Sequence, residues 1–205
     1  MKKLAVFASG NGSNFENIVQ AVDTGRLTGA EVSLLVTDRP SARCVERANR
    51  LGVPVFAFEP KSYPSKEACE AEIVFKLQAH GISLVVLAGY MRLVGPTLLN
   101  AYQGRMINLH PSLLPAFAGK DAVGQALAYG VKVTGVTVHI VDSGLDSGPI
   151  IAQIPVRVEP NDTHQSLTEK IHAVERQLLV EVVQDLVLDR IRIKGRTTHK
   201  LTADV

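Results

Sequence analysis

Residues 4–22 read LAVFASGNGSNFENIVQAV, an apolar run that leads through a glycine-rich turn into a helix-length amphipathic segment. The run at 4–8 is continuous rather than alternating, which is typical of a parallel strand covered on both faces. Similar runs occupy 32–36, 55–58 and 84–88, and helix-length segments occupy 13–22, 42–51 and 66–80. This alternation predicts an α/β fold with an open, doubly wound, mostly parallel sheet and right-handed crossovers.

The second half of the chain predicts three more strands and two more helices. The strands are expected at 105–109, 135–141 and 149–158, and a helix at 122–129. A long helix follows Asp162 and Gln165, which offer a cap, and its apolar residues recur every three or four positions to Leu186. We therefore expect one domain over 1–189 and a basic C-terminal tail over 190–205, solvated or paired as an edge strand.

Composition excludes several classes of protein. The 205 residues are 46% hydrophobic and 20% charged, with a net charge of +2, as in one ordinary globular domain. This charge gives no reason to expect nucleic acid or an anionic membrane as partner. No stretch reaches the roughly 18 apolar residues of a membrane span, and the start does not read as a signal peptide. With Cys44 and Cys69 interpreted as reduced thiols, we expect a cytoplasmic protein.

The turn SGNGSN at 9–14 lies where the first strand gives way to the first helix. In an open α/β sheet, ligands bind at this carboxyl edge, and a helix N-terminus with nearby glycines suits an anion. Phe15 stands where a dinucleotide fingerprint has its third glycine, and the lysine of a P-loop is missing, so a single phosphate is the better match. Ser13 and Asn14 can add side-chain donors or cap the helix. The alternative is a tight turn with a helix cap and no ligand.

A second polar cluster is predicted at the end of a later strand. Asn108 and His110 are two residues apart and project to the same side, and Pro111 stops the strand. The glycine-containing loop after the next strand carries Asp142 and Asp146, which can turn back toward the strand ends. Amide, imidazole and carboxylate without a nucleophile suggest direct transfer between two bound substrates. The alternative is that His110 caps a turn and that both acids are solvated loop residues.

Four motifs stand in order along the chain: SGNGSN (9–14), AGYMRL (88–93), NLHPSLLP (108–115) and LDSGP (145–149). Together they closely resemble the phosphoribosylglycinamide formyltransferases, the folate-dependent formyltransferases of purine biosynthesis. The resemblance covers roughly residues 2–188. The Asn-His-Pro-Ser element alone indicates only the wider formyltransferase superfamily, and its combination with the phosphate loop makes the resemblance specific. It implies a Rossmann-like formyltransferase fold.

The resemblance implies transfer of a formyl group from 10-formyltetrahydrofolate, as co-substrate, to the amine of phosphoribosylglycinamide, without a metal. It implies Asn108, His110 and Asp146 as catalytic residues. The residues that it assigns to phosphoribosylglycinamide are Gly12, Ser13, Asn14, His172 and Glu175, the last two on one exposed helix face. The residues that it assigns to folate are Lys66, Met91, Arg92, Leu93, Val94, Asn108, Asp142, Ser143, Gly144, Leu145 and Asp146, with Leu93 and Val94 lining an apolar slot.

Some features are left open by this pattern. Ala118 stands where the family usually has proline, and we expect residues 118–130 to form a mobile lid that orders with ligands. His139 is either a supporting residue of the site or a packed strand histidine.

The expected partners are small molecules, with no nucleic acid or membrane, and the chain is expected to be a monomer or a homodimer. Three alternatives are a methionyl-tRNA formyltransferase, a formyltetrahydrofolate hydrolase and a nucleotide-binding module without catalysis.

Overall fold

The computed structural model describes residues 1–201. These residues fall into two compact units, which divide after Ile107. Residues 202–205 of the predicted basic tail lie outside the described residues. Among residues 1–201, no helix is long and apolar enough to cross a membrane.

The apolar runs of the first unit become parallel strands. The last four residues of β1 (Lys2–Phe7) are buried, as are all four of β4 (Leu84–Leu87). β1 pairs in parallel with β4 and with β2 (Ala30–Thr37), and β2 pairs in parallel with β3 (Val55–Ala57). Continuous apolar runs are expected in strands whose two faces are both covered. The predicted strands are therefore confirmed here, with ends that differ by one or two residues.

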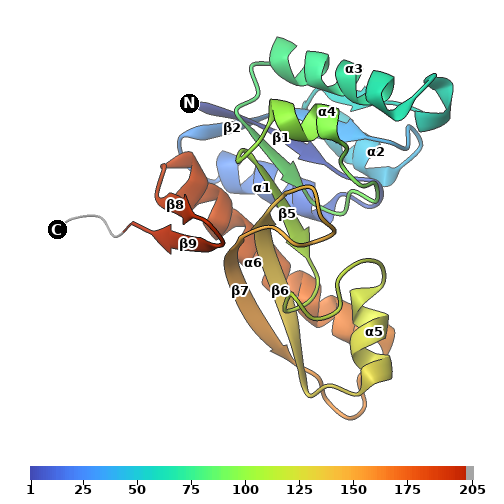
Figure 1. Cartoon of the computed structure of the whole chain (residues 1–205), viewed down its shortest axis with the longest axis vertical. Coiled ribbons are helices and arrows are strands. Elements are labelled where there is room, and N and C mark those ends of the chain that lie inside the picture. Colours follow the sequence, from blue (N-terminus) through green and yellow to red (C-terminus); the bar gives the residue numbers. More distant parts are fainter. Residues whose placement is uncertain (202–205) are drawn as a thin grey trace. The chain divides into compact units, whose positions relative to one another are not determined.

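Three predicted helices of the first unit are also present, as α1 (Ser13–Asp23), α2 (Arg43–Arg50) and α3 (Lys66–Ala79). Two short helical elements were not predicted from the sequence, η1 (Pro60–Ser62) and α4 (Pro96–Ala101). Both begin with a proline, which suits a first helical turn. α4 lies beside α3 in Figure 1 and packs against it.

The start of α1 differs from the expectation that Ser13 or Asn14 would cap it. The N-cap is Gly12, in a left-handed conformation with φ 73°, and no side-chain hydrogen bond caps the helix there. Glycine takes this conformation without the steric cost that a Cβ would add. The chain thus enters α1 through a glycine rather than through a side-chain cap.

The second unit begins within β5 (Met106–His110), since the chain divides after Ile107. β6 (Val133–Ile140) and β7 (Ile150–Arg157) form an antiparallel pair, with a register shift between Val138 and His139. α5 (Ala122–Tyr129) has the predicted bounds. α6 (His164–Val187) packs against β6, β7 and α5, and Figure 1 shows it running along the strand pair. The strand order β3-β2-β1-β4-β5-β6-β7 makes a mixed, mostly parallel sheet, which confirms the predicted fold class.

The cap of α6 lies one residue later than predicted. Thr163 is the N-cap, and it forms a reciprocal pair of hydrogen bonds with Ser166. Asp162 instead accepts hydrogen bonds from Ser166 Oγ, at 2.7 Å, and from Lys170 Nζ, at 2.7 Å. The acid therefore supports the first turn from outside the helix.

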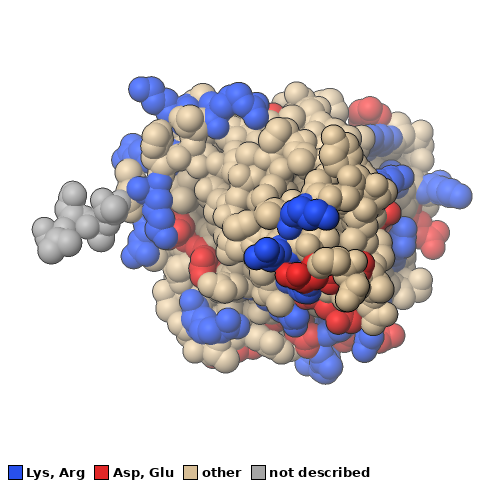
Figure 2. Space-filling model, turned by 90° about the horizontal axis from the view of Figure 1, so that it is seen from below, with Lys and Arg blue, Asp and Glu red and all other residues tan. Residues whose placement is uncertain are grey.

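The basic segment after α6 contains an antiparallel hairpin, β8 (Ile191–Lys194) and β9 (Thr197–Lys200). Thr198 Oγ1 donates to Ile150 O, at 2.7 Å, and Arg196 Nη2 donates to Ser147 O, at 2.9 Å. The hairpin is thus attached to the start of β7. In Figure 2, Lys and Arg side chains, in blue, gather at the left, the side on which Figure 1 places the hairpin.

Candidate active site

Two polar side chains at the end of β5 reach the same carboxylate. The Asn108 amide nitrogen lies 3.3 Å from Asp146 Oδ1, and His110 Nδ1 lies 3.4 Å from Asp146 Oδ2. Both side chains leave the same face of the strand because they are two residues apart. His110 is only 5% exposed. The structure therefore brings together the three residues that the resemblance implies as catalytic.

Asp146 reaches the strand end because the loop after β6 folds on itself. Asp142 Oδ1 accepts hydrogen bonds from Gly144 N, at 3.0 Å, and from Ser147 Oγ, at 2.7 Å. Asp146 itself has a left-handed backbone with φ 49°, which is uncommon for a residue with a Cβ. Of the two acids in the loop, Asp142 shapes the turn and Asp146 faces the imidazoles.

The pKa of the Asp146 carboxyl is lowered from its ordinary value of 3.8. Burial is the largest influence and acts to raise it. The contact with His139, the hydrogen bond from Gly119 N–H, and the charges of His110 and His139 when protonated oppose burial and outweigh it. The Gly119 nitrogen lies 2.8 Å from Asp146 Oδ2. Asp146 is therefore ionised at neutral pH.

Each ring nitrogen of His110 faces an oxygen. Nε2 lies 2.9 Å from the Phe117 carbonyl oxygen, and Nδ1 faces the Asp146 carboxylate. A carbonyl oxygen can only accept, so Nε2 carries a hydrogen. In a neutral ring Nδ1 is therefore bare, whereas in an imidazolium it carries an N–H that faces the carboxylate at 3.4 Å. The arrangement can thus hold an imidazolium beside Asp146.

His139 on β6 is the fourth member of this cluster. Its side chain is buried, and Nδ1 lies 2.8 Å from the Ile140 carbonyl oxygen, which places the hydrogen of a neutral ring on Nδ1. Nε2 then accepts from the Asn108 amide nitrogen, at 3.2 Å. In a protonated ring, Nε2 faces Asp146 Oδ1 instead, at 3.7 Å. Of the two roles left open by the sequence, the structure favours a supporting residue that orients Asn108.

The loop before α5 closes against this cluster through its backbone. The Phe117 carbonyl accepts from His110, and Gly119 N–H donates to Asp146. Gln125 Nε2 fastens the loop to α5 by donating to Ala118 O, at 3.2 Å, and to Lys120 O, at 2.8 Å. The segment at 118–130 thus begins in direct contact with the candidate catalytic residues. Its behaviour as a lid stays a prediction.

In the first unit, Gly12 and α2 shape the turn after β1. A Cβ on Gly12 would lie 2.5 Å from Cys44 Cβ, in addition to the strain of its positive φ. Arg47 Nε donates to Asn11 O, at 2.8 Å. Because Arg47 also pairs with Glu16, much of its charge is compensated. An anion at this turn would therefore meet mainly the backbone N–H groups at the start of α1.

The segment at 91–94 presents apolar side chains to its surroundings. Met91 and Leu93 are 64% and 65% exposed. Leu93 is therefore largely exposed, and its predicted role in lining an apolar slot stays a prediction. Lys66 is partly exposed at the start of α3, with Nζ 4.0 Å from Glu70 Oε1. A flat aromatic ligand could cover these apolar side chains.

His172 and Glu175 lie together on α6, with His172 Nε2 4.0 Å from Glu175 Oε2. The expectation of one exposed face is wrong for Glu175, which is only 5% exposed, whereas half of the His172 side chain is exposed. The acid belongs to the buried stripe of the helix, one turn after Ile171. Its buried side chain can hold the imidazole in place from below.

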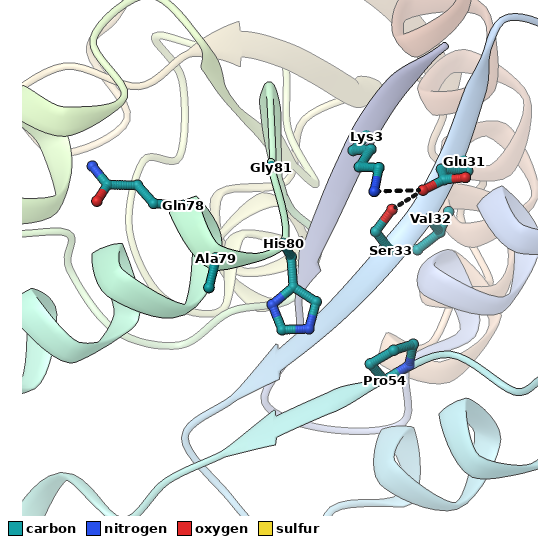
Figure 3. Close-up of a pocket in the computed structure, with 9 residues that line it drawn as sticks. All are labelled: Lys3, Glu31, Val32, Ser33, Pro54, Gln78, Ala79, His80 and Gly81. Carbon is teal, nitrogen blue, oxygen red and sulfur yellow. Dashed lines mark hydrogen bonds and ion pairs between the residues drawn. The ribbon is translucent and has the colours of Figure 1, made fainter.

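A surface pocket of about 630 Å³ lies at the opposite edge of the sheet in the first unit. Figure 3 shows it between the amino ends of β1 and β2 and the end of α3, where Lys3 and Ser33 both contact Glu31. No residue predicted to bind substrate or to act in catalysis lines it. Its lining residues are Lys3, Glu31, Val32, Ser33, Pro54, Gln78, Ala79, His80 and Gly81. It is therefore separate from the carboxyl edge at which β1 and β4 end.

Several residues that support these segments were not predicted from the sequence. Ser9 and Glu70 are both buried and bond to the backbone around 91–98. Glu70 had a usable signal, because it falls on the same helical stripe as Ile73 and Leu77, where an acid is out of place. The Phe117 carbonyl and the Gly119 N–H had none, since backbone groups do not show in a side-chain pattern.

Known proteins are similar to this chain in fold and in sequence. The formyl transferase family profile matches residues 2–183. The crystal structure of glycinamide ribonucleotide transformylase 1 from Symbiobacterium toebii superposes with a TM-score of 0.96, at 42% identity, covering 98% of this chain and 95% of that one. The corresponding Geobacillus kaustophilus structure gives 0.89 at 56% identity, covering 91% and 99%. Fold and site thus define the class of protein as a formyl transferase.

Two curated relatives narrow this class. The phosphoribosylglycinamide formyltransferase of Bacillus subtilis is 53% identical over 187 residues, which span 91% of this chain and 95% of that protein. That of Mycobacterium tuberculosis is 45% identical over 195 residues, spanning 95% and 89%. The chain belongs to the phosphoribosylglycinamide formyltransferase family.

Proposed function

We propose that this chain transfers the formyl group of 10-formyltetrahydrofolate directly to the glycinamide amine of N1-(5-phospho-D-ribosyl)glycinamide, in de novo purine biosynthesis, with Asn108, His110 and Asp146 as catalytic residues. Membership of the family supports the reaction. The convergence of an amide and an imidazole on one ionised carboxylate carries the residue assignment.

The proposed transfer passes through a tetrahedral intermediate. The amine attacks the formyl carbon, forming a C–N bond and placing negative charge on the formyl oxygen. Protonated His110 and the Asn108 amide stabilise this oxyanion by donating hydrogen bonds. The bond from the formyl carbon to the folate nitrogen then breaks, and that nitrogen takes up the proton that the amine loses. Asp146 keeps His110 charged throughout.

Both proposed donors are occupied in the structure without substrate. His110 Nε2 donates to Phe117 O, and the Asn108 amide nitrogen is bonded to His139 and Asp146. Each must exchange one of these bonds for the oxyanion. Catalytic hydrogen bonds often tighten only when substrate is bound. Release of the Phe117 carbonyl therefore gives the predicted lid a specific chemical role.

The state of the two thiols supports direct transfer over a covalent intermediate. Burial raises the pKa of Cys44 and of Cys69, so both remain protonated at neutral pH. A buried thiol is a poor nucleophile because the thiolate is the reactive form. Neither cysteine is therefore suited to carry the formyl group.

The substrate-binding residues belong to the same proposal. The open start of α1 at Gly12, Ser13 and Asn14 would hold the substrate phosphate through backbone N–H groups. His172, held by Glu175, would contact the phosphoribosyl part. The folate residues would be Lys66, Met91, Arg92, Leu93, Val94, Asn108 and the loop Asp142, Ser143, Gly144, Leu145 and Asp146. The apolar side chains at 91–94 support a flat ring there.

A product assay with and without phosphoribosylglycinamide tests the proposed reaction. The purified chain is mixed with 10-formyltetrahydrofolate, and tetrahydrofolate is followed by absorbance. Turnover that depends on phosphoribosylglycinamide and gives equal amounts of its N-formyl product is expected. Equal deformylation without the amine would indicate the hydrolase, and no turnover would indicate the nucleotide-binding module.

The setting of the reaction follows from the same proposal. The partners are small molecules, the location is cytoplasmic, and no metal takes part. Among residues 1–201, no group of three or more His, Cys, Asp or Glu is placed to hold a metal ion. Chelator treatment before the product assay is expected to leave the rate unchanged.

A further inference from the structure

The backbone of the segment at 91–95 is held at both ends by buried side chains. Met91 N–H donates to Ser9 Oγ, at 2.9 Å, and Gly95 N–H donates to Glu70 Oε1, at 2.5 Å. Between these anchors, Met91 and Leu93 extend large apolar side chains that are about two-thirds exposed. An anchored backbone with exposed apolar side chains calls for an explanation.

The first anchor is oriented by a second acid. Ser9 is 1% exposed, and its hydroxyl donates to Asp38 Oδ1, at 2.5 Å. Because the hydroxyl hydrogen points to Asp38, its lone pairs are free to accept from Met91 N–H. Ser9 N–H also donates to Gly89 O, at 3.0 Å, so the serine holds the start of the segment through two bonds.

The second anchor is a buried carboxylate on α3. Glu70 is 5% exposed, and its second oxygen accepts from Leu98 N–H, at 3.2 Å. It thus satisfies two N–H groups at the start of α4 that have no partner within that helix. A Cβ on Gly95 would lie 2.7 Å from Glu70 Oε1 and 2.9 Å from Lys66 Cε, so the three residues are closely packed.

We propose that Ser9 and Glu70 are positioning residues that fix the segment at 91–95 in the conformation that binds the folate substrate, and that Glu70 also orients Lys66 there. The inference rests on the proposed function, which assigns folate to this segment. Neither residue is expected to touch the reacting atoms.

Ser9 and Glu70, together called the clamp, would favour folate binding through preorganisation of the segment at 91–95. A segment that is already ordered loses less conformational freedom when its ligand binds, so more of the contact energy appears as affinity. Exposed Met91 and Leu93 side chains on a fixed backbone give a planar ligand a ready surface. Loss of an anchor should therefore weaken binding of folate much more than binding of phosphoribosylglycinamide.

Glu70→Ala and Glu70→Gln test the clamp, with Glu67→Gln as matched control. Glutamine keeps one oxygen for Gly95 N–H but loses the charge and presents an amide donor to Leu98 N–H, so it should be the milder change. Glu67 lies on the same helix near Lys66, but its side chain is exposed. Ser9→Ala tests the other anchor, with Ser33→Ala at the far edge of the sheet as control.

The readouts are the Kd of tetrahydrofolate and of phosphoribosylglycinamide by calorimetry, and hydrogen exchange of the 89–98 backbone. We expect Glu70→Ala to raise the tetrahydrofolate Kd on the order of tenfold, Glu70→Gln less, and both to speed exchange. The Glu70 variants should leave the Kd of phosphoribosylglycinamide nearly unchanged, and the control variants should match the parent in both Kd values. Ser9→Ala should also weaken tetrahydrofolate binding.

Several results would overturn the clamp. One is faster exchange in the Glu70 variants with an unchanged tetrahydrofolate Kd, which would make the anchors structural only. An equal loss of affinity for tetrahydrofolate and for phosphoribosylglycinamide would also overturn it. So would a Glu67→Gln variant that weakens tetrahydrofolate binding as much as Glu70→Gln does. Because binding requires no chemistry, a parent chain that binds tetrahydrofolate but fails the product assay would contradict the proposed function and leave the clamp intact.

Discussion

Asp146 is the residue at which the candidate site can be tested by pH. Burial acts to raise the pKa of its carboxyl, but His139, Gly119 N–H and His110 outweigh burial and keep that pKa below 3.8. A carboxyl whose pKa is lower in the folded chain than in the unfolded chain stabilises the fold fully at pH values above the unfolded pKa. That contribution is lost as the pH falls through the folded pKa.

Asp146→Asn should therefore remove a pH-dependent part of the stability. We expect the difference in Tm between parent and variant to be largest near neutral pH and to shrink below about pH 4. Thermal melts between pH 7 and pH 3 measure it. Asp23→Asn, a change at an exposed acid, should leave the parent profile unaltered. A constant difference between Asp146→Asn and parent at every pH would contradict the lowered pKa.

Gly12→Ala should damage the turn before α1 for two reasons. Alanine at φ 73° is strained, and its Cβ would lie 2.5 Å from Cys44 Cβ. We expect a loss of about 1–3 kcal/mol in the free energy of unfolding and weaker binding of phosphoribosylglycinamide. Urea unfolding and calorimetry measure the two effects. At Gly10 a Cβ meets nothing within 4 Å, so Gly10→Ala should cost clearly less stability, and equal costs would refute this reasoning.

At the scale of elements, the strands and long helices follow from the sequence, and short polar elements do not. Parallel strands can be recognised in the sequence as continuous apolar runs because both of their faces are buried. α4 and the hairpin β8–β9 have too few buried residues to make a pattern. The hairpin is instead attached by particular bonds, such as Thr198 Oγ1 to Ile150 O, which no periodicity reveals.

The start of α6 gives a prediction at this scale. Thr163 accepts from Ser166 N–H, at 3.1 Å, and Ser166 Oγ accepts from Thr163 N–H, at 3.0 Å. Thr163→Ala removes half of this reciprocal cap and should lower the free energy of unfolding by about 1 kcal/mol. Thr168→Ala, at an exposed hydroxyl inside the same helix, should change it by less than about 0.5 kcal/mol. Urea unfolding that ranked the two variants the other way would contradict the assigned cap.

For the whole molecule, the order of elements and the three candidate catalytic residues could be predicted, whereas the groups that hold them in place could not. Asn108 and His110 share a strand end, and Asp146 follows in a glycine-containing loop, so local sequence places them. His139, the Phe117 carbonyl and Gly119 N–H join them only through tertiary structure. The residues that position a site can therefore be identified only from the structure, even where the sequence indicates the candidate catalytic residues.

In the proposed reaction, His110, held by Asp146, stabilises the oxyanion in direct formyl transfer. The single-turnover rate of His110→Ala tests this role, with the Kd of tetrahydrofolate and of phosphoribosylglycinamide measured on the same protein. We expect the rate to fall on the order of a hundredfold or more, with both affinities largely retained. A rate near that of the parent would show that His110 does not have this role.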